Sequence, residues 1–229
     1  MSRRPFTFYE FFAGGGMARL GLGAGWACRF ANDFDPVKAA AYRANFGGGD
    51  FHQGDVFDLT AADLPGRVDL AWASSPCQDF SLAGGRAGLA GGRSSAFHGF
   101  WRLIEGLNAE GRAPRVVAVE NVPGLLTSHG GRDFAAVCRG LTAQGYRFRV
   151  LEVDAARFLP QSRRRVLIVG AREGLAADPR TWWPAWPAVP PEGRTLDLAA
   201  VLEPDDRVAW RSKAQTGRLV SLMNPRHRE

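Results

Sequence analysis

The sequence predicts an α/β protein built on a mostly parallel, twisted sheet with helices on both faces. Short apolar runs alternate with segments of helical periodicity over residues 6–171, the pattern of strands joined by helical crossovers. A glycine-rich turn, residues 13–25, follows the first of these runs directly. Polar and reactive side chains recur next to the ends of apolar runs, as expected where strands open onto one crevice.

Local signals place the individual elements. Strands are expected where apolar, β-branched and aromatic residues cluster over a few positions, at 6–12, 26–33, 68–73, 115–121, 146–155 and 164–171, with a third extended segment that ends near Asp55. Helices are expected where apolar residues recur every three or four positions or a helix start is visible, at 36–46, 95–107 and 133–141. Pro36 suits the first turn of a helix, and we interpret Asp35 as its N-cap.

Composition narrows the class of protein. The 229 residues are 45% hydrophobic and 23% charged, which is ordinary for a globular domain. No apolar run approaches the roughly 18–20 residues that span a bilayer, and the N-terminus lacks the apolar region of a signal peptide. We therefore expect a cytoplasmic protein without a membrane partner. The three cysteines and four histidines form no metal motif, so no metal is expected.

The charge is unevenly distributed along the chain. The formal net charge is +6, yet residues 207–229 alone hold six basic residues and one acidic residue. A basic segment of this kind indicates a nucleic-acid partner contacted mainly by the C-terminal end.

The glycine-rich turn indicates a nucleoside site without a pyrophosphate. Counted from Gly14, a dinucleotide fingerprint G-x-G-x-x-G fails because Arg19 stands at its third glycine, and no P-loop is present. Asp33 ends the second strand about 20 residues after the first glycines of the turn, where a ribose-binding carboxylate is expected. S-adenosylmethionine, which carries adenosine and no phosphate, fits this pattern. A tight strand-to-helix turn is the alternative for the loop, and a simple turn residue is the alternative for Asp55.

A thiol, a carboxylate and guanidinium groups are expected to converge at the carboxyl ends of the strands. Cys77 follows the run 68–73, Glu120 ends the run 115–121, and Arg163 and Arg165 precede the last apolar run. Together they suggest covalent catalysis on a polar heterocycle, with the thiolate as nucleophile and arginines that lower its pKa. Taken singly, each has a structural alternative: a packing cysteine, a turn carboxylate and a solvated basic run.

The order of these features resembles the cytosine-5 DNA methyltransferase family of bacterial type. The resemblance covers about residues 6–172, and it rests on four motifs: F-x-G-x-G at Phe12, Gly14 and Gly16, P-C-Q at Pro76, Cys77 and Gln78, E-N-V at Glu120, Asn121 and Val122, and Q-x-R-x-R at Gln161, Arg163 and Arg165. It implies the Rossmann-like fold of S-adenosylmethionine-dependent methyltransferases, DNA as partner, and a place in restriction-modification.

The resemblance also implies residue roles. The methyl-donor pocket would be lined by Phe12, Gly14, Gly16, Asp33, Phe34, Asp55, Val56 and Pro76. Among these, Asp33 would bind the ribose hydroxyls and Phe34 would pack on the adenine, with Asp55 and Val56 at its edge. The target cytosine would be flipped out of the helix.

The implied catalytic residues are Cys77, Glu120, Arg163 and Arg165. Cys77 would add to carbon 6 of the cytosine while Glu120 bonds the N3 side of the ring. Carbon 5 would then take the methyl group, and loss of its proton would release Cys77. Arg163 would contact the base oxygen or nearby backbone, and Asn121 would support the loop that holds Cys77.

The end of the chain departs from the family pattern. Residues 1–172 are predicted to form the catalytic domain, the Pro- and Trp-rich 173–193 its exit, and 194–229 the start of a target-recognition region. The late motifs and returning last helix of the family are not recognisable, so we expect a truncated chain or one subunit of a split enzyme that needs a second chain. The alternatives are an RNA methyltransferase with the same chemistry and a catalytically incomplete subunit. A dehydrogenase is disfavoured by the failed fingerprint.

Overall fold

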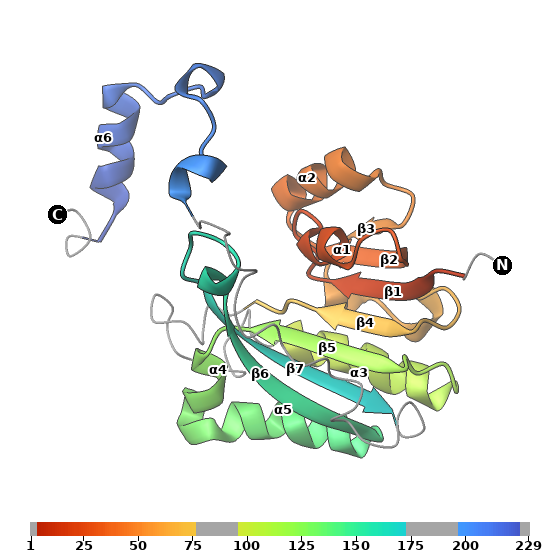
Figure 1. Ribbon diagram of the computed structural model, residues 1–229. Coiled ribbons are helices and arrows are strands. Elements are labelled where there is room, and N and C mark those ends of the chain that lie inside the picture. The colour runs from red at the N-terminus through yellow and green to blue at the C-terminus, as the bar shows by residue number, and fades with distance from the viewer. Residues whose placement is uncertain (1–3, 77–95, 173–196, 225–229) are drawn as a thin grey trace.

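A computed structural model describes residues 4–76, 96–172 and 197–224 of the protein. Its centre is a seven-stranded sheet in the order β3-β2-β1-β4-β5-β7-β6 (Figure 1). The strands are β1 (Phe6–Phe11), β2 (Trp26–Asp33), β3 (Phe51–Gln53), β4 (Leu70–Ala73), β5 (Val116–Asn121), β6 (Tyr146–Asp154) and β7 (Arg164–Arg172). All neighbours among β1 to β5 pair in parallel, whereas β7 is antiparallel to both β5 and β6. The predicted mostly parallel sheet is confirmed.

Helices cover both faces of this sheet, as predicted. The helices are α1 (Met17–Leu22), α2 (Pro36–Phe46), α3 (Ala96–Ala109), the short α4 (Gly124–Thr127), α5 (Arg132–Ala143) and α6 (Lys213–Leu222). In Figure 1, α1 and α2 lie on one side of the sheet and α3 and α5 on the other. The strands alternate accordingly: Tyr9 and Phe11 of β1 belong to the core beneath α3, while Phe8 faces the opposite side.

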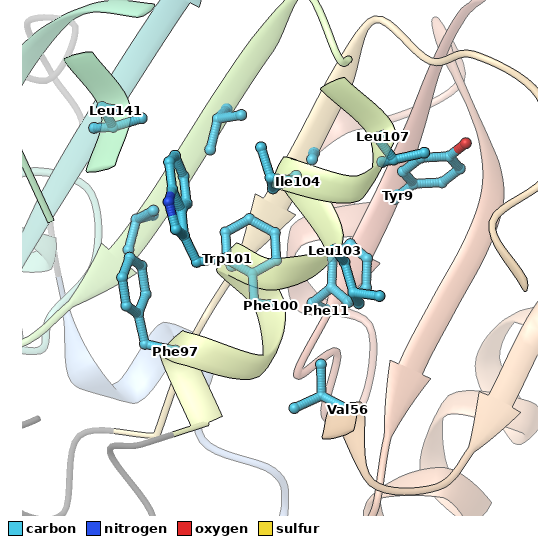
Figure 2. Close-up of a cluster of buried hydrophobic side chains, with 14 of the residues drawn as sticks. Tyr9, Phe11, Val56, Phe97, Phe100, Trp101, Leu103, Ile104, Leu107 and Leu141 are labelled. Carbon is cyan, nitrogen blue, oxygen red and sulfur yellow. The ribbon is translucent and has the colours of Figure 1, made fainter. Parts of the chain in front are cut away.

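The main core lies between α3 and the sheet (Figure 2). Phe100, Leu103, Ile104 and Leu107 of α3 are at most 1% exposed, and their spacing places them on one face of the helix. Phe100 packs against Phe11 of β1 with ring centroids 5.1 Å apart. Burying each such side chain contributes roughly 1.5–3 kcal/mol, so this face of α3 fixes the helix on the sheet.

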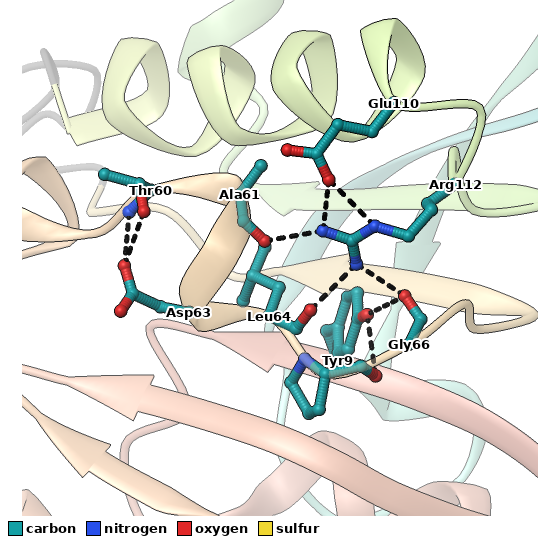
Figure 3. Close-up of polar contacts among 9 residues, drawn as sticks. Tyr9, Thr60, Ala61, Asp63, Leu64, Gly66, Glu110 and Arg112 are labelled. Carbon is teal, nitrogen blue, oxygen red and sulfur yellow. Dashed lines mark hydrogen bonds and ion pairs between the residues drawn. The ribbon is translucent and has the colours of Figure 1, made fainter.

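One arginine fastens the connection before β4 to the end of α3 (Figure 3). Arg112 donates to the backbone carbonyl oxygens of Ala61, Leu64 and Gly66 at 2.6–2.8 Å, and it pairs with Glu110. The hydroxyl of Tyr9 donates to the Gly66 carbonyl as well, at 3.1 Å. These carbonyl groups lie in a connection without strand partners, so Arg112 and Tyr9 supply them with hydrogen-bond donors; the Ala61 carbonyl also accepts the Leu64 N–H.

The described C-terminal part, 197–224, lies apart from the sheet in Figure 1. It contains two 3-10 turns, η6 (Leu198–Val201) and η7 (Asp205–Arg207), and then α6. A capping box between Ser212 and Gln215 begins α6, and its side chains are exposed along the whole helix. The proposed exit segment 173–193 lies outside the described residues.

Candidate active site

A cavity of about 470 Å³ opens at the carboxyl ends of β1, β2 and β4. Its described walls are Phe12, Asn32, Phe34, Asp35, Lys38, Gly54, Asp55, Val56, Phe57, Pro76 and Ala96. Five of the eight residues expected around a methyl donor are on this wall: Phe12, Phe34, Asp55, Val56 and Pro76. Carboxylates, an aromatic side chain and an apolar floor suit a nucleoside, which needs acceptors for hydroxyl groups and a surface for its base.

The glycine-rich turn is shaped by backbone conformations that favour glycine. Gly14 and Gly16 have φ of 56° and 85°, and a Cβ on Gly16 would lie 2.3 Å from Cε2 of Phe46. A Cβ on Gly14 would meet nothing within 4 Å, so its positive φ is the reason for glycine there. Phe12 also has a left-handed φ of 57°, at a cost of ~1–2 kcal/mol. The turn therefore carries strain next to the cavity, as binding sites often do.

Asp33 fastens this turn to the end of β2. Its Oδ2 accepts the Gly14 N–H at 2.9 Å, and its Oδ1 accepts the Asp35 N–H at 3.0 Å. The residue is only 3% exposed. Asp35 caps α2 by accepting the N–H groups of Val37 and Lys38, which confirms its predicted role, and it lines the cavity as well.

The cavity wall also holds a carboxylate, Asp55, and an exposed aromatic residue, Phe34. Asp55 Oδ1 accepts the Phe57 N–H at 3.0 Å and so begins the 3-10 turn η1 (Val56–Asp58). Val56 is buried at 3% exposure, whereas the ring of Phe34 is 60% exposed at the cavity. A large apolar ring that folding leaves in water offers a surface on which a base can stack.

Beneath the turn lies a buried carboxyl group. Glu10 of β1 is 1% exposed, its Oε1 accepts the Arg19 N–H at 3.4 Å, and its Oε2 has no hydrogen-bond partner within the described part of the chain. Burial raises the pKa of Glu10 from 4.5 to about 7. The sequence shows Glu10 where the family often has aspartate, but nothing in it indicates this burial.

Hydrogen bonds hold the short segment that follows β4 and precedes Cys77. Trp72 Nε1 donates to Ser74 Oγ at 2.9 Å, and Asn121 Nδ2 donates to the buried Ser75 Oγ at 3.1 Å. Pro76 then lines the cavity. Cys77 itself lies outside the described residues, as do Gln78 and the rest of 77–95.

Two of the other predicted catalytic residues, Glu120 and Arg165, meet across β5 and β7. Arg165 Nε lies 2.7 Å from Glu120 Oε1, and each side chain is about a quarter exposed. Arg163 lies two residues earlier, and its backbone N–H donates to Asp154 at 2.8 Å. In an antiparallel pair of this register, Asn121 is opposite Val166, so Arg165 lies just beyond the end of β5.

The arginines were expected to reach this crevice in a parallel-type sheet, and the structure corrects the direction of the strand that carries them. Arg163 and Arg165 lie at the amino end of the last strand, and they reach the catalytic edge because β7 is antiparallel. A reversed strand presents its first residues where its parallel neighbours present their last ones. Apolar runs do not reveal strand direction, which is why the sequence pattern could not show it.

The two described cysteines are poor nucleophiles. Burial raises the pKa of Cys28 to about 11, with Asp50 adding to the shift, and the Cys28 Sγ lies 3.7 Å from the Tyr42 hydroxyl. Burial also raises the pKa of Cys138. Since the thiolate is the reactive form, Cys28 and Cys138 fit packing roles, which leaves Cys77 as the candidate for covalent chemistry.

Sequence reasoning missed Asn32, Lys38, Phe57 and Ser75. Asn32, Lys38 and Phe57 line the cavity, and Asn32 also donates to the carbonyl oxygens of His52 and Gly54 at 3.2 and 2.9 Å. The position of Asn32 beside Asp33 at a strand end was an available signal. Ser75 gave none, because its partner Asn121 is 46 residues away.

Two further properties concern the described residues only. In them, no group of three or more His, Cys, Asp or Glu side chains is placed to hold a metal ion. None of their helices combines the length and apolar character needed to cross a membrane.

The chain shares its fold with solved structures of methyltransferases. S. pombe Dnmt2 methyltransferase matches with a TM-score of 0.60 and 24% identity, over 73% of this chain and 51% of its own. A putative DNA modification methyltransferase encoded within an E. coli prophage matches with a TM-score of 0.61 and 23% identity, over 74% of this chain and 47% of its own.

The particular family follows from sequence. The chain belongs to the C-5 cytosine-specific DNA methylases, whose family pattern matches residues 6–215. It is 35% identical to type II methyltransferase M.BsuFI of Bacillus subtilis over 171 residues, and 32% identical to M.HaeII of Haemophilus aegyptius over 208 residues. These matches cover 74% and 90% of this chain but 40% and 60% of the two relatives.

Proposed function

We propose that this chain carries the catalytic part of a DNA (cytosine-5) methyltransferase that uses S-adenosylmethionine. The observation that carries the proposal is the Glu120–Arg165 pair, 2.7 Å apart, at the same sheet edge as the donor-type cavity and the anchored entry to Cys77. Activation of a pyrimidine ring requires a carboxyl group that can bond the ring together with a nucleophile, and Glu120 would supply the carboxyl group. The type II methyltransferases named above support DNA as substrate and a role in restriction-modification, and with it a cytoplasmic location.

The methyl donor fits the cavity at the ends of β1 and β2. The exposed ring of Phe34 would stack on the adenine, with Asp55 and Val56 at its edge. Asp33 would serve the ribose and also holds Gly14 in place. Phe12, Gly14, Gly16 and Pro76 would bound the remaining walls. When bound, S-adenosylmethionine supplies a methyl group on a positively charged sulfur.

The chain's own residues would then act on a cytosine flipped into the crevice. The Cys77 thiolate adds to carbon 6, and the ring electrons shift toward carbon 5. Glu120 bonds the N3 side of the ring, and Arg165 holds Glu120 in orientation through their ion pair. Carbon 5 would bond the methyl carbon as its bond to the donor's sulfur breaks, which leaves a neutral thioether, and carbon 5 would then lose its proton to water. The bond between sulfur and carbon 6 then breaks and frees Cys77.

Arg163 and Asn121 would have supporting roles in this reaction. Arg163 is exposed at the start of β7, where it would contact the base oxygen or the adjacent DNA backbone. Asn121 is buried and bonded to Ser75, so it would hold the approach to Cys77 rather than touch the base. Asn121 is therefore a positioning residue.

Covalent trapping tests the function. DNA that contains 5-fluorocytosine should form a stable adduct with the complete enzyme and S-adenosylmethionine, because fluorine cannot leave as the proton does. Cys77→Ser should abolish the adduct, while Cys138→Ser should leave it unchanged. Glu120→Gln should slow its formation by roughly 10²–10⁴-fold. An undiminished adduct with Cys77→Ser would refute the assignment.

The substrate is tested in the same assay. Fluorocytosine-substituted RNA is offered beside the DNA at equal concentration. Preferential trapping of the RNA would contradict the DNA proposal and support the RNA methyltransferase alternative. Failure with both substrates, by a complete enzyme that binds the methyl donor, would favour a catalytically incomplete subunit.

A further inference from the structure

A second cavity lies at the amino ends of the strands, whereas the candidate active site lies at the carboxyl ends of the parallel strands. It measures about 330 Å³ and is walled by Arg4, Pro5, Phe6, Thr7, Arg67, Val68, Asp69 and Arg115. These residues begin β1, β4 and β5 or directly precede them, on the side of the sheet where Figure 1 marks the N-terminus. The methyltransferase reaction proposed above uses none of them.

Positive charge dominates this cavity. On the described wall, three arginines, Arg4, Arg67 and Arg115, stand with a single acidic residue, Asp69. Asp69 Oδ2 already accepts the N–H and the hydroxyl of Thr7, at 3.0 and 3.2 Å. Its other oxygen lies 3.5 Å from Nη1 of Arg115, whose side chain is half exposed, and a pair of that length at the surface contributes little. The carboxylate therefore leaves most guanidinium N–H groups available.

The floor of the cavity is rigid. The Asp69 N–H donates to the Thr7 carbonyl at 2.9 Å, and the Val116 N–H donates to the Asp69 carbonyl at 2.8 Å. These bonds join the three strands at their amino ends. Next to Arg67, the Gly66 carbonyl accepts from both Tyr9 and Arg112. A floor fixed in this way limits the entropy lost when a ligand binds.

We propose that this cavity is a binding site for a phosphate group. Guanidinium groups bind phosphate oxygens through paired N–H donors, which makes arginine the preferred residue for planar, two-point recognition. A cavity of about 330 Å³ suits a small polyphosphate or one backbone step of a nucleic acid. The two cavities lie at opposite ends of β1, whose six residues span about 20 Å. The phosphate bound here therefore belongs to a different molecule from the target cytosine, or to a different part of the same nucleic acid.

Binding of pyrophosphate and of a thymidine tetranucleotide to the full chain, measured calorimetrically at low salt, tests the site. The double variant Arg67→Gln, Arg115→Gln removes two guanidinium groups and keeps most of the packing. We expect at least one ligand to lose affinity about tenfold or more in this variant. Arg139→Gln, an exposed arginine on α5, is the matched control and should bind as the wild type does.

The pattern of losses identifies the source of the phosphate. A loss confined to pyrophosphate indicates a free polyphosphate, and an equal loss with the tetranucleotide indicates a nucleic-acid backbone. Equal affinities of the double variant and the control for both ligands would overturn the proposal. Affinity for S-adenosylmethionine should be unchanged in all variants, which shows that the fold is intact. If the double variant does not fold, Arg67→Gln alone is used, with a loss of about threefold expected.

Discussion

Asp33 connects a strand end, the glycine-rich turn and the candidate donor cavity. Its two carboxylate oxygens accept backbone N–H groups from Gly14 and Asp35. A carboxylate that accepts two such bonds has limited capacity left, so any ribose contact would share oxygen atoms with the turn. The residue therefore influences donor binding in two ways, by direct contact and through the position of Gly14.

Replacing Asp33 should weaken the methyl-donor site. Asp33→Ala removes the acceptor of two backbone N–H groups and the proposed ribose contact, so S-adenosylmethionine affinity should fall by about 1–3 kcal/mol. Isothermal titration calorimetry measures this loss. Asp58→Ala, exposed at the end of η1, is the control. Unchanged donor affinity in Asp33→Ala would move the role to another carboxylate, with Asp35 next in line.

Glu10 should make stability depend on pH. Burial raises its pKa from 4.5 to about 7 in the folded protein, so the folded state binds this proton more tightly than the unfolded state does. The resulting stabilisation is complete below pH 4.5 and is lost as pH rises through 7. Its size is at most about 3 kcal/mol.

Glu10→Gln isolates this effect. The variant lacks the ionisable group, so relative to the wild type it should gain free energy of unfolding between pH 5 and pH 8. Urea unfolding at the two pH values measures the difference. Glu105→Gln, exposed on α3, should show no such trend. A wild-type pH profile that parallels Glu10→Gln would mean that Glu10 is solvated or paired.

At the scale of elements, β4 and β5 form the junction on which the candidate site depends. Ala73 pairs with Val119 in parallel register, and two residues further along each chain segment Asn121 donates to Ser75. On the other side of β5, the reversed β7 brings Arg165 to Glu120. Strand pairing therefore sets the positions of these side chains, and no single loop could do so.

Arg112 should contribute strongly to the stability of the same sheet. Arg112→Ala would leave the carbonyl groups of Ala61, Leu64 and Gly66 without this donor, and we expect a loss of about 2–4 kcal/mol in the free energy of unfolding. Chemical denaturation measures it. Arg139→Ala should change stability by no more than about 0.5 kcal/mol. A loss in Arg112→Ala equal to that of the control would show that water replaces the guanidinium at no cost.

At the scale of the whole molecule, apolar side chains remain exposed on α1 and α2. Met17 and Leu20 of α1 are 73% and 63% exposed, and Val37 of α2 is 78% exposed. Since the chain covers 40–60% of the two relatives, we propose that a segment carrying the late motifs packs here, either in the same protein or in a second chain. Its target-recognition region would extend from the basic 207–229.

This proposal predicts complementation. The 229-residue chain alone should bind DNA weakly and with strong salt dependence, and it should transfer little tritiated methyl from labelled S-adenosylmethionine. A fragment with the recognition region and late motifs should restore transfer. Met17→Glu should impair restoration, whereas Val150→Glu on β6 should not. Efficient, site-specific methylation by this chain alone would contradict the proposal.

The sequence by itself predicted the alternation of strands and helices, and it predicted five of the residues that line the cavity. Phe12, Phe34, Asp55, Val56 and Pro76 were expected around the donor because the resemblance to the cytosine-5 DNA methyltransferase family implied it, and the motifs that carry this resemblance are local in sequence. The N-cap role of Asp35 followed from Pro36 alone. These inferences hold because helix starts, strand ends and glycine turns are decided by neighbours within a few residues.

Only the tertiary structure decided how distant residues meet. The reversed direction of β7, the bond between Ser75 and Asn121, and the burial of Glu10 all depend on which strands pair and what covers them. Strand direction is set by the connections and by packing over the whole sheet, and burial by side chains far away in sequence. The arginine-walled cavity at the amino ends of β1, β4 and β5 likewise exists only because three separate strands begin side by side.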